Sequence, residues 1–139
     1  MYMLDDLRTI AFPLHDTRDS SLSVYQSLQE VPFNIKRVFV IHTRKFCHRG
    51  FHAHKECNQL LVCLQGRVIV TVDDGSQKKE FVLENASEGL LIPSSLWAEQ
   101  IYEASSILMV LTDQPYDEKD YIRNYQEFLE YRKIKRGKE

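Results

Sequence analysis

The stretch Gly50-Phe51-His52-Ala53-His54, followed by Gln59 and Gly66, decides how this chain is interpreted. His52 and His54 are two residues apart, four residues separate His54 from Gln59, and six separate Gln59 from Gly66. In a β-strand, residues two apart point to the same face, so both imidazoles are expected to address one cavity. Histidine has an ordinary pKa of about 6.5, which suits proton transfer near neutral pH. The pair is therefore predicted to act as acid and base without a cofactor.

Two other interpretations of these histidines remain open. They could be ordinary core or solvent-facing residues, or they could belong to a retained transition-metal site. A metal site needs more ligands than two histidines, and Gln59 offers only a neutral amide. His42 and His48 are the other candidate ligands, and His48 is expected in the polar loop before the strand. We predict no metal site.

Composition limits the classes of function. The 139 residues with 43% hydrophobic content predict one domain, residues 1–139, with one core. A formal net charge of −2 shows no basic excess for nucleic acid. No apolar run reaches the roughly 20 residues that cross a bilayer, and the first ten residues lack a signal-peptide core. The three cysteines form no CxxC pair, so we expect a reduced, cytoplasmic protein without nucleic-acid or membrane partners.

Most of the chain is predicted to form short strands separated by turns. β-branched and aromatic residues mark strands at 35–41, 60–64, 67–72, 80–83, 90–93 and 107–111. The segment 60–64 is continuously apolar and is expected to be buried on both faces. Asp73-Asp74-Gly75 predicts a hairpin turn. This spacing of short strands is typical of a sandwich or barrel.

The C-terminal part has a helical pattern instead. Asp117 is expected to cap a helix over about 117–135. Its apolar residues follow the spacing of one buried stripe: Tyr121, Ile122, Tyr125, Phe128 and Leu129. This helix is predicted to pack on the outside of the strands.

Three arginines indicate the kind of ligand. Arg37 lies in the predicted strand 35–41, Arg49 directly precedes Gly50, and Arg18 lies in a polar segment near the N-terminus. A guanidinium binds phosphate oxygens through two parallel hydrogen bonds. Each arginine alone could be an ordinary surface residue, but together they predict an anionic, phosphorylated ligand.

The spacing around His52 and His54 is similar to the first metal motif of the cupins. The resemblance implies an all-β jelly roll, or double-stranded β-helix, with the predicted C-terminal helix added. Cupin metal sites usually have Glu at the position of Gln59 and His at the position of Ala98, directly after the single tryptophan. Two of four ligands are therefore missing, which agrees with the prediction of no metal and no cofactor.

A closer resemblance covers nearly the whole chain. The chain resembles the WxcM-like sugar 3,4-ketoisomerases, and Arg-Gly-Phe-His-Ala-His-Lys is its most specific string. The matching segments are Ile35-Lys36-Arg37-Val38-Phe39, Arg49-Gly50-Phe51-His52-Ala53-His54-Lys55, Leu61-Val62-Cys63-Leu64-Gln65-Gly66, Asp73-Asp74-Gly75 and Tyr116-Asp117-Glu118-Lys119-Asp120-Tyr121-Ile122-Arg123.

The resemblance implies a homodimer that acts on dTDP-4-keto-6-deoxyglucose. It would move the ketone from carbon 4 to carbon 3 through an enediol, without a metal, for deoxysugars of bacterial surface polysaccharides. His54 would be the base and His52 its partner in proton transfer. The substrate would contact Arg37, Arg49, Arg18, Gln59 and Trp97.

The chain departs from its relatives at two positions. Many relatives carry tyrosine after the Arg-Val pair, where this chain has Phe39 and Val40, and many carry histidine where this chain has Ala98. Three alternatives therefore stay open: a sugar-nucleotide-binding protein without turnover, a sugar-nucleotide epimerase, and a metal-dependent cupin such as a dioxygenase.

Overall fold

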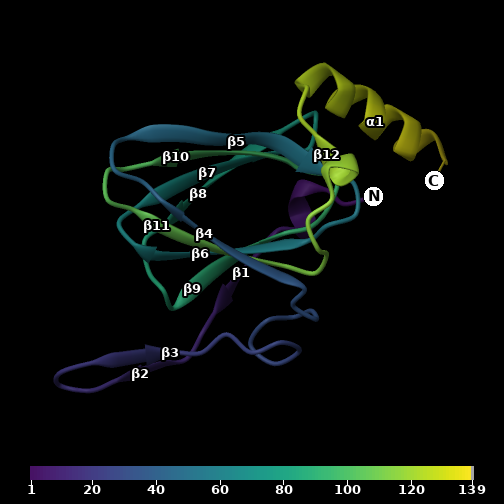
Figure 1. The fold of residues 1–139 in the computed structure, drawn as a ribbon. Coiled ribbons are helices and arrows are strands. Elements are labelled where there is room, and N and C mark those ends of the chain that lie inside the picture. The colour runs from purple at the N-terminus through teal and green to yellow at the C-terminus, as the bar shows by residue number, and fades with distance from the viewer. Residues whose placement is uncertain (139) are drawn as a thin grey trace.

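Two five-stranded antiparallel sheets face each other and form a jelly roll (Figure 1). The computed structural model describes residues 1–138; Glu139, the last residue of the predicted domain, lies outside them. The first sheet has the order β1 (Arg8–Ala11), β9 (Glu88–Ile92), β6 (Gln59–Gln65), β11 (Ile107–Thr112), β4 (Arg37–His42). The second has the order β12 (Tyr121–Ile122), β5 (Cys47–His54), β10 (Trp97–Tyr102), β7 (Val68–Asp73), β8 (Lys78–Leu83).

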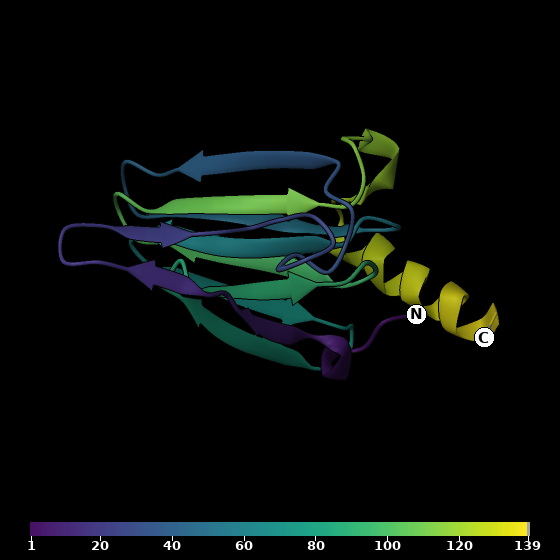
Figure 2. The same ribbon diagram turned by 90° about the horizontal axis from the view of Figure 1, so that it is seen from below.

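The remaining elements lie outside these sheets. A 3₁₀ turn, Leu4–Asp6, precedes β1, and a second turn, η2 (Glu118–Asp120), precedes β12. Strands β2 (Leu14–Asp16) and β3 (Ser21–Ser23) form a separate hairpin that projects from the body (Figure 1). Helix α1 (Tyr125–Lys138) and both ends of the chain lie at one end of the sheets (Figure 2). No helix within residues 1–138 is long and apolar enough to cross a membrane.

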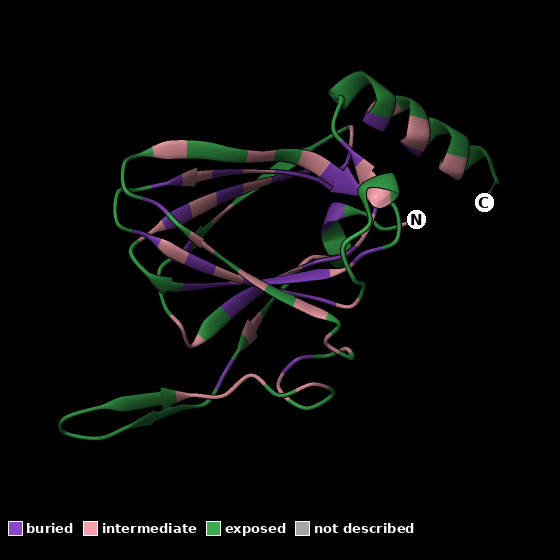
Figure 3. Cartoon of the chain, viewed as in Figure 1, coloured by how far each residue is buried: buried purple, intermediate pink, exposed green. Residues whose placement is uncertain are grey.

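The core lies between the two sheets, where inward-facing residues of both meet. β7 shows the alternation, because Val68, Val70 and Val72 are fully buried while Ile69 and Thr71 between them are partly exposed (Figure 3). The prediction of an all-β jelly roll with a C-terminal helix is confirmed.

Strand β6 is buried on both faces, as predicted for 60–64, except at its end. Leu61 and Cys63 belong to the core between the sheets, while Leu60 and Val62 pack under the segment that follows β1. Leu64 is exposed. Burial on both sides explains why this strand lacks alternation in the sequence.

The C-terminal helix begins later than the sequence predicted. Asp117 caps the short turn η2, accepting a hydrogen bond from Lys119 N, and Asn124 Oδ1 accepts from Glu127 N at 3.0 Å at the start of α1. Tyr121 and Ile122 form β12 and pair with His54 and Ala53 of β5. The predicted range of 117–135 was wrong at its start because pairing with the open edge of β5 overrides the helical pattern.

The predicted packing of the helix against the strands is confirmed. Phe128 of α1 is fully buried and packs with Ala53, Trp97 and Ile122 on the outer side of the second sheet. This packing fixes the position of β12 beside β5, and with it the residues that precede β12.

A β-bulge in β5 determines which residues face the interior. In the pairing with β10, His52 lies opposite Ala98 and Gly50 lies opposite Glu99, so Phe51 is an extra residue on β5. Gly50 has φ of +91° and Phe51 has φ of +60°. In a regular strand Arg49 and His52, three residues apart, would point to opposite faces. The inserted residue brings both to the inner face.

The bulge yields a prediction for Gly50→Ala. A Cβ at this position would lie 2.8 Å from Gln100 Oε1 and 2.9 Å from the Ala98 carbonyl oxygen, in a backbone conformation that disfavours side chains. We expect the free energy of unfolding to fall by about 1–3 kcal/mol in urea denaturation. Gly137→Ala is the control, because nothing lies within 4 Å of its added Cβ. Equal stability of the two variants would contradict this account of the bulge.

Candidate active site

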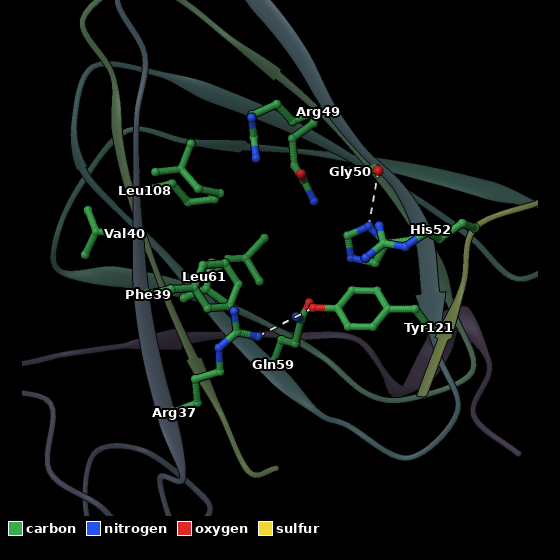
Figure 4. A pocket seen from close by; sticks show the side chains of 14 residues that line it. Arg37, Phe39, Val40, Arg49, Gly50, His52, Gln59, Leu61, Leu108 and Tyr121 are labelled. Atoms are coloured by element: carbon green, nitrogen blue, oxygen red, sulfur yellow. Dashed lines mark hydrogen bonds between the residues drawn. The ribbon is translucent and has the colours of Figure 1, made fainter. Parts of the chain in front are cut away.

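A cavity of about 330 Å³ lies between the two sheets beside the bulge (Figure 4). Its apolar wall comes from the first sheet: Phe39, Leu61, Leu108 and Val110. Its polar wall comes from β5, β6, β10 and the segment around β12: Arg49, His52, Gln59, Gln100, Tyr121 and Arg123. Such a combination of apolar surface and a few convergent polar groups is typical of a small-molecule site.

His52 presents an unprotonated nitrogen to this cavity. Its Nδ1 lies 3.1 Å from the carbonyl oxygen of Gly50, which accepts only, so Nδ1 carries the proton and donates (Figure 4). The pKa of His52 is lowered to about 4, mainly by burial and with smaller contributions from nearby His54 and Arg123. The ring is therefore neutral at pH 7, and Nε2 is available as a base.

His54 lies behind this surface and does not line the cavity. It is 7% exposed, and its ring centroid is 5.1 Å from that of His52. Nδ1 lies 2.9 Å from Asp120 Oδ2 and Nε2 lies 3.0 Å from Gln59 Nε2. Burial lowers the pKa of His54, while the Asp120 carboxylate opposes that shift. Both histidines share one face of β5, as predicted, but only His52 reaches the cavity.

Tyr121 of β12 lies between the two histidines and the arginines. Its ring centroid is 4.4 Å from that of His54 and 5.1 Å from that of His52. Its hydroxyl accepts a hydrogen bond from Arg37 Nη1 at 3.5 Å (Figure 4). The guanidinium of Arg123 lies 4.3 Å from the centre of the same ring. The phenol hydroxyl is thus held at the cavity beside a positive charge.

Three guanidinium groups make the cavity suitable for an anion. Arg37, Arg49 and Arg123 all line it. Arg49 also lines a neighbouring hollow together with Arg44 and Lys45. Arg123 is already paired with Glu118 at 2.8 Å, on an exposed surface where such a pair is weak. The positive charge therefore extends from the cavity to its surroundings, as a phosphorylated ligand requires.

Two of the predicted substrate contacts lie elsewhere in this chain. Arg18 lies in the exposed turn between β2 and β3 and does not line the cavity. The hairpin that carries it projects from the body (Figure 1). Trp97 is 4% exposed and packs against Ala53 and Phe128 on the outer side of the second sheet. His48, expected in a loop, lies on β5 and is exposed. The structure gathers Arg37, Arg49, Gln59 and His52 around the cavity.

Three functional candidates were missed from the sequence: Asp120, Tyr121 and Arg123. The helical pattern places Tyr121 in a buried stripe and Asp120 in the first turns of the predicted helix. The signal that could have found them is the segment 116–123, which was noted only as part of the resemblance. Their position depends on the pairing of β12 with β5.

His54, Cys57 and Asp120 could each offer a ligand atom to a metal ion, within 4.8 Å of one another. Burial raises the pKa of the Cys57 thiol to about 11, and the carboxylates of Asp113 and Asp120 contribute to this rise. The thiol is therefore protonated at neutral pH, and Asp120 is already bonded to His54. These residues serve as a hydrogen-bonded support for His54.

The neutral state of His52 can be tested without a ligand. In the unfolded chain this histidine titrates near its ordinary pKa of about 6.5, but in the folded protein it takes up a proton only near pH 4. The unfolded state thus binds more protons between these values, and His52 makes the fold less stable as pH falls through that window. NMR titration of the ring nitrogens, assigned with His52→Asn, measures this directly. Protonation near pH 6.5 in the folded protein would contradict the assignment.

Comparison with known proteins places the chain in a family. The family model "FdtA: WxcM-like, C-terminal" matches residues 4–133. A curated relative from Aneurinibacillus thermoaerophilus, named TDP-4-oxo-6-deoxy-alpha-D-glucose-3,4-oxoisomerase, is 40% identical over 118 residues, which are 84% of either chain.

Solved structures agree with this family. QdtA, a sugar 3,4-ketoisomerase from Thermoanaerobacterium thermosaccharolyticum solved in complex with TDP, superposes with a TM-score of 0.90 at 33% identity, covering 96% of this chain and 98% of QdtA. The dTDP-4-dehydrorhamnose 3,5-epimerase of Bacillus anthracis has a TM-score of 0.72 at 16% identity, over 84% of this chain and 77% of its own, and shares the fold alone. Because the family model covers most of the chain and a relative shares 40% of the aligned residues, this chain belongs to the WxcM-like family.

Proposed function

We propose that this protein is a sugar-nucleotide 3,4-ketoisomerase that moves the ketone of dTDP-4-keto-6-deoxyglucose from carbon 4 to carbon 3. The observation that carries the proposal is the neutral His52, whose free Nε2 faces a cavity bordered by Arg37, Arg49 and Arg123. Relatives named as 3,4-ketoisomerases, one of them solved with TDP, support the choice of substrate class.

The reaction needs one carbon-bound proton removed and one delivered. His52 Nε2 takes the proton from carbon 3. The electron pair that is left forms a double bond between carbons 3 and 4, and the ketone oxygen on carbon 4 becomes the negatively charged oxygen of an enediolate. That oxygen gains a proton, carbon 4 is protonated, and the hydroxyl on carbon 3 loses its proton to become the new ketone. No electrons or groups leave the sugar, so acid–base groups are sufficient.

His52 replaces His54 as our choice for the base, because His54 does not line the cavity. A pKa of about 4 would make His52 a weak base in the free protein. The diphosphate of the substrate would bring negative charge to the arginines, and this charge raises the pKa of a nearby histidine toward the working pH. Substrate binding would therefore strengthen the base.

Tyr121 supplies an acid for the sugar oxygens. Phe39 and Val40 stand where many relatives have tyrosine. Tyr121, on a different strand, brings a phenol hydroxyl to the same cavity. Arg37 Nη1 donates to the phenol oxygen, so the proton of the phenol itself is directed elsewhere and can be donated to a ligand oxygen. We propose that it protonates the developing enediolate oxygen.

His52→Asn tests the proposed base. Loss of a general base lowers kcat by about 100- to 10,000-fold. The product formed in deuterated water, in the presence of a chelator, is identified by NMR, which separates a 3-keto isomer from an epimer. His48→Asn is the matched control, since His48 is exposed on the same strand.

The outcomes separate the competing functions. Full activity of the His52→Asn variant would show that His52 is not the base. An epimer as the product would support the epimerase instead, and tight TDP binding without proton exchange would support a binding protein. Loss of activity with the chelator would favour a metal-dependent cupin.

We also propose that two copies form a homodimer through the β2–β3 hairpin and the free edge of β4. An isolated two-stranded hairpin is at most marginally stable in water. On this hairpin Leu14 is 48% and Leu22 is 59% exposed, and on β4 Val38 and Val40 are exposed at the edge of the first sheet. A second copy that covers these residues would stabilise both features.

The free thiols of the three cysteines support a further proposal, that the protein acts in the cytoplasm.

Replacement of Leu14 and Leu22 by Glu tests the dimer. Burying two carboxylates without partners is costly, so the double variant should sediment as a monomer where the wild type sediments as a dimer. Ile134→Glu is the control, because Ile134 is 59% exposed on α1, far from the hairpin. A monomeric wild type, or a dimeric double variant, would contradict the proposal.

A further inference from the structure

We infer that Asp120 and His54 are positioning residues that hold the side-chain amide of Gln59 in one orientation, with its oxygen free to accept a hydrogen bond from a sugar hydroxyl in the cavity. These roles rest on the proposed isomerase function and deepen it, because they name the group that recognises the reacting part of the sugar. The chain of contacts runs from η2 through β5 to β6.

Asp120 is fixed at the start of this chain of contacts. Its Oδ1 accepts a hydrogen bond from Glu56 N at 2.7 Å, and its Oδ2 accepts from Cys57 N at 3.4 Å and from His54 Nδ1 at 2.9 Å. Its backbone carbonyl accepts from Lys55 N at 2.9 Å. Because an ionised carboxylate only accepts, the proton between His54 and Asp120 belongs to His54 Nδ1.

The tautomer of His54 then fixes the direction of the next contact. With its proton on Nδ1, the neutral ring has a lone pair on Nε2. Gln59 Nε2 lies 3.0 Å from this atom and is a donor only. The amide nitrogen therefore donates to His54 Nε2. The donor on Gln59 and the acceptor on His54 match in the orientation that the structure shows.

The remaining polar atom of the amide is Gln59 Oε1. Gln59 is 8% exposed and lines the cavity, as Figure 4 shows, near Tyr121. Within residues 1–138 no hydrogen bond to Oε1 is formed. Oε1 is not among the buried side-chain atoms that lack a partner, so it opens into the cavity, where a carbonyl oxygen without a protein partner is suited to accept a hydrogen bond from a ligand. The hydroxyl on carbon 3, which must give up its proton during the reaction, is such a donor.

Asp120 could instead serve only to tie the loop after β5 to η2. Asp120→Asn separates the two roles. Its Oδ1 still accepts from Glu56 N, but Nδ2 now donates to His54 Nδ1, which forces the His54 proton onto Nε2. Gln59 must then turn its oxygen to His54 and its NH₂ group to the cavity, which removes the acceptor.

The expected results have two independent readouts. NMR of the ring nitrogens should show His54 protonated on Nδ1 in the wild type and on Nε2 in Asp120→Asn. The kcat/KM should fall by about 10- to 100-fold, as is typical when the partner that orients a functional histidine is changed. Asp117→Asn is the matched control: the same substitution in the cap of the same turn, where Asn caps as well as Asp.

Gln59→Glu in the Asp120→Asn background provides a rescue. There Nε2–H of His54 would donate to one carboxylate oxygen of residue 59, and the other oxygen would again face the cavity as an acceptor. The double variant should therefore be more active than either single variant, whereas independent defects would make it the least active.

Several results would overturn the inference. They are a wild-type His54 protonated on Nε2, an Asp120→Asn variant that keeps the Nδ1 tautomer or full kcat/KM, and a double variant no better than Asp120→Asn. If urea denaturation shows that Asp120→Asn is not folded, the tautomer of His54 in the wild type decides alone whether the inference holds. The tautomer needs no turnover, so a wild type without isomerase activity would reject the proposed function and leave this measurement intact.

Discussion

One extra residue in β5 brings Arg49 and His52 to the same side of the strand. The pleat of a regular strand would send them to opposite faces, so either the anion-binding charge or the base would be lost from the cavity. The conformation is demanding, because Phe51 adopts a positive φ that bulky residues rarely take. Gly50 permits it by leaving room for Gln100 and the Ala98 carbonyl. Such strain persists where the surrounding sheet holds it in place.

The second constraint is the pairing of β12 with the free edge of β5. Only two residues of β12 pair, but they bring η2, Tyr121 and Arg123 to the histidines. Asp120 then joins His54 through a hydrogen bond between a charged and a neutral group, in a place where water is scarce. Bonds of this kind are stronger than exposed ion pairs such as Arg123–Glu118. The site is thus built by two elements that are far apart in the sequence.

Much of the fold could be predicted because hydrophobic alternation is a local signal. The strands around 60–64, 67–72 and 107–111 were found near their observed positions, and burial of β6 on both faces follows from its unbroken apolar run. The start of α1 could not be predicted in this way. Tyr121 and Ile122 fit a helical stripe as well as a short strand, and only the open edge of β5 decides between them. The prediction that Trp97 contacts the substrate was wrong for a related reason. One face of β10 packs against α1 and the other against the core, and spacing along the chain does not show which face Trp97 is on.

The sequence by itself determined the fold class, the pair of histidines on one strand face, the absence of a carboxylate at Gln59, and the resemblance to the WxcM-like family. These follow from residue type and spacing within short segments. Only the tertiary structure decided that His52 rather than His54 faces the cavity and that Arg18 and Trp97 lie away from it. It also decided that Tyr121 and Arg123 line the cavity, while Asp120 bonds to His54 behind it. Depth within a site and the identity of hydrogen-bond partners depend on how distant strands pair, and spacing along the chain does not encode either.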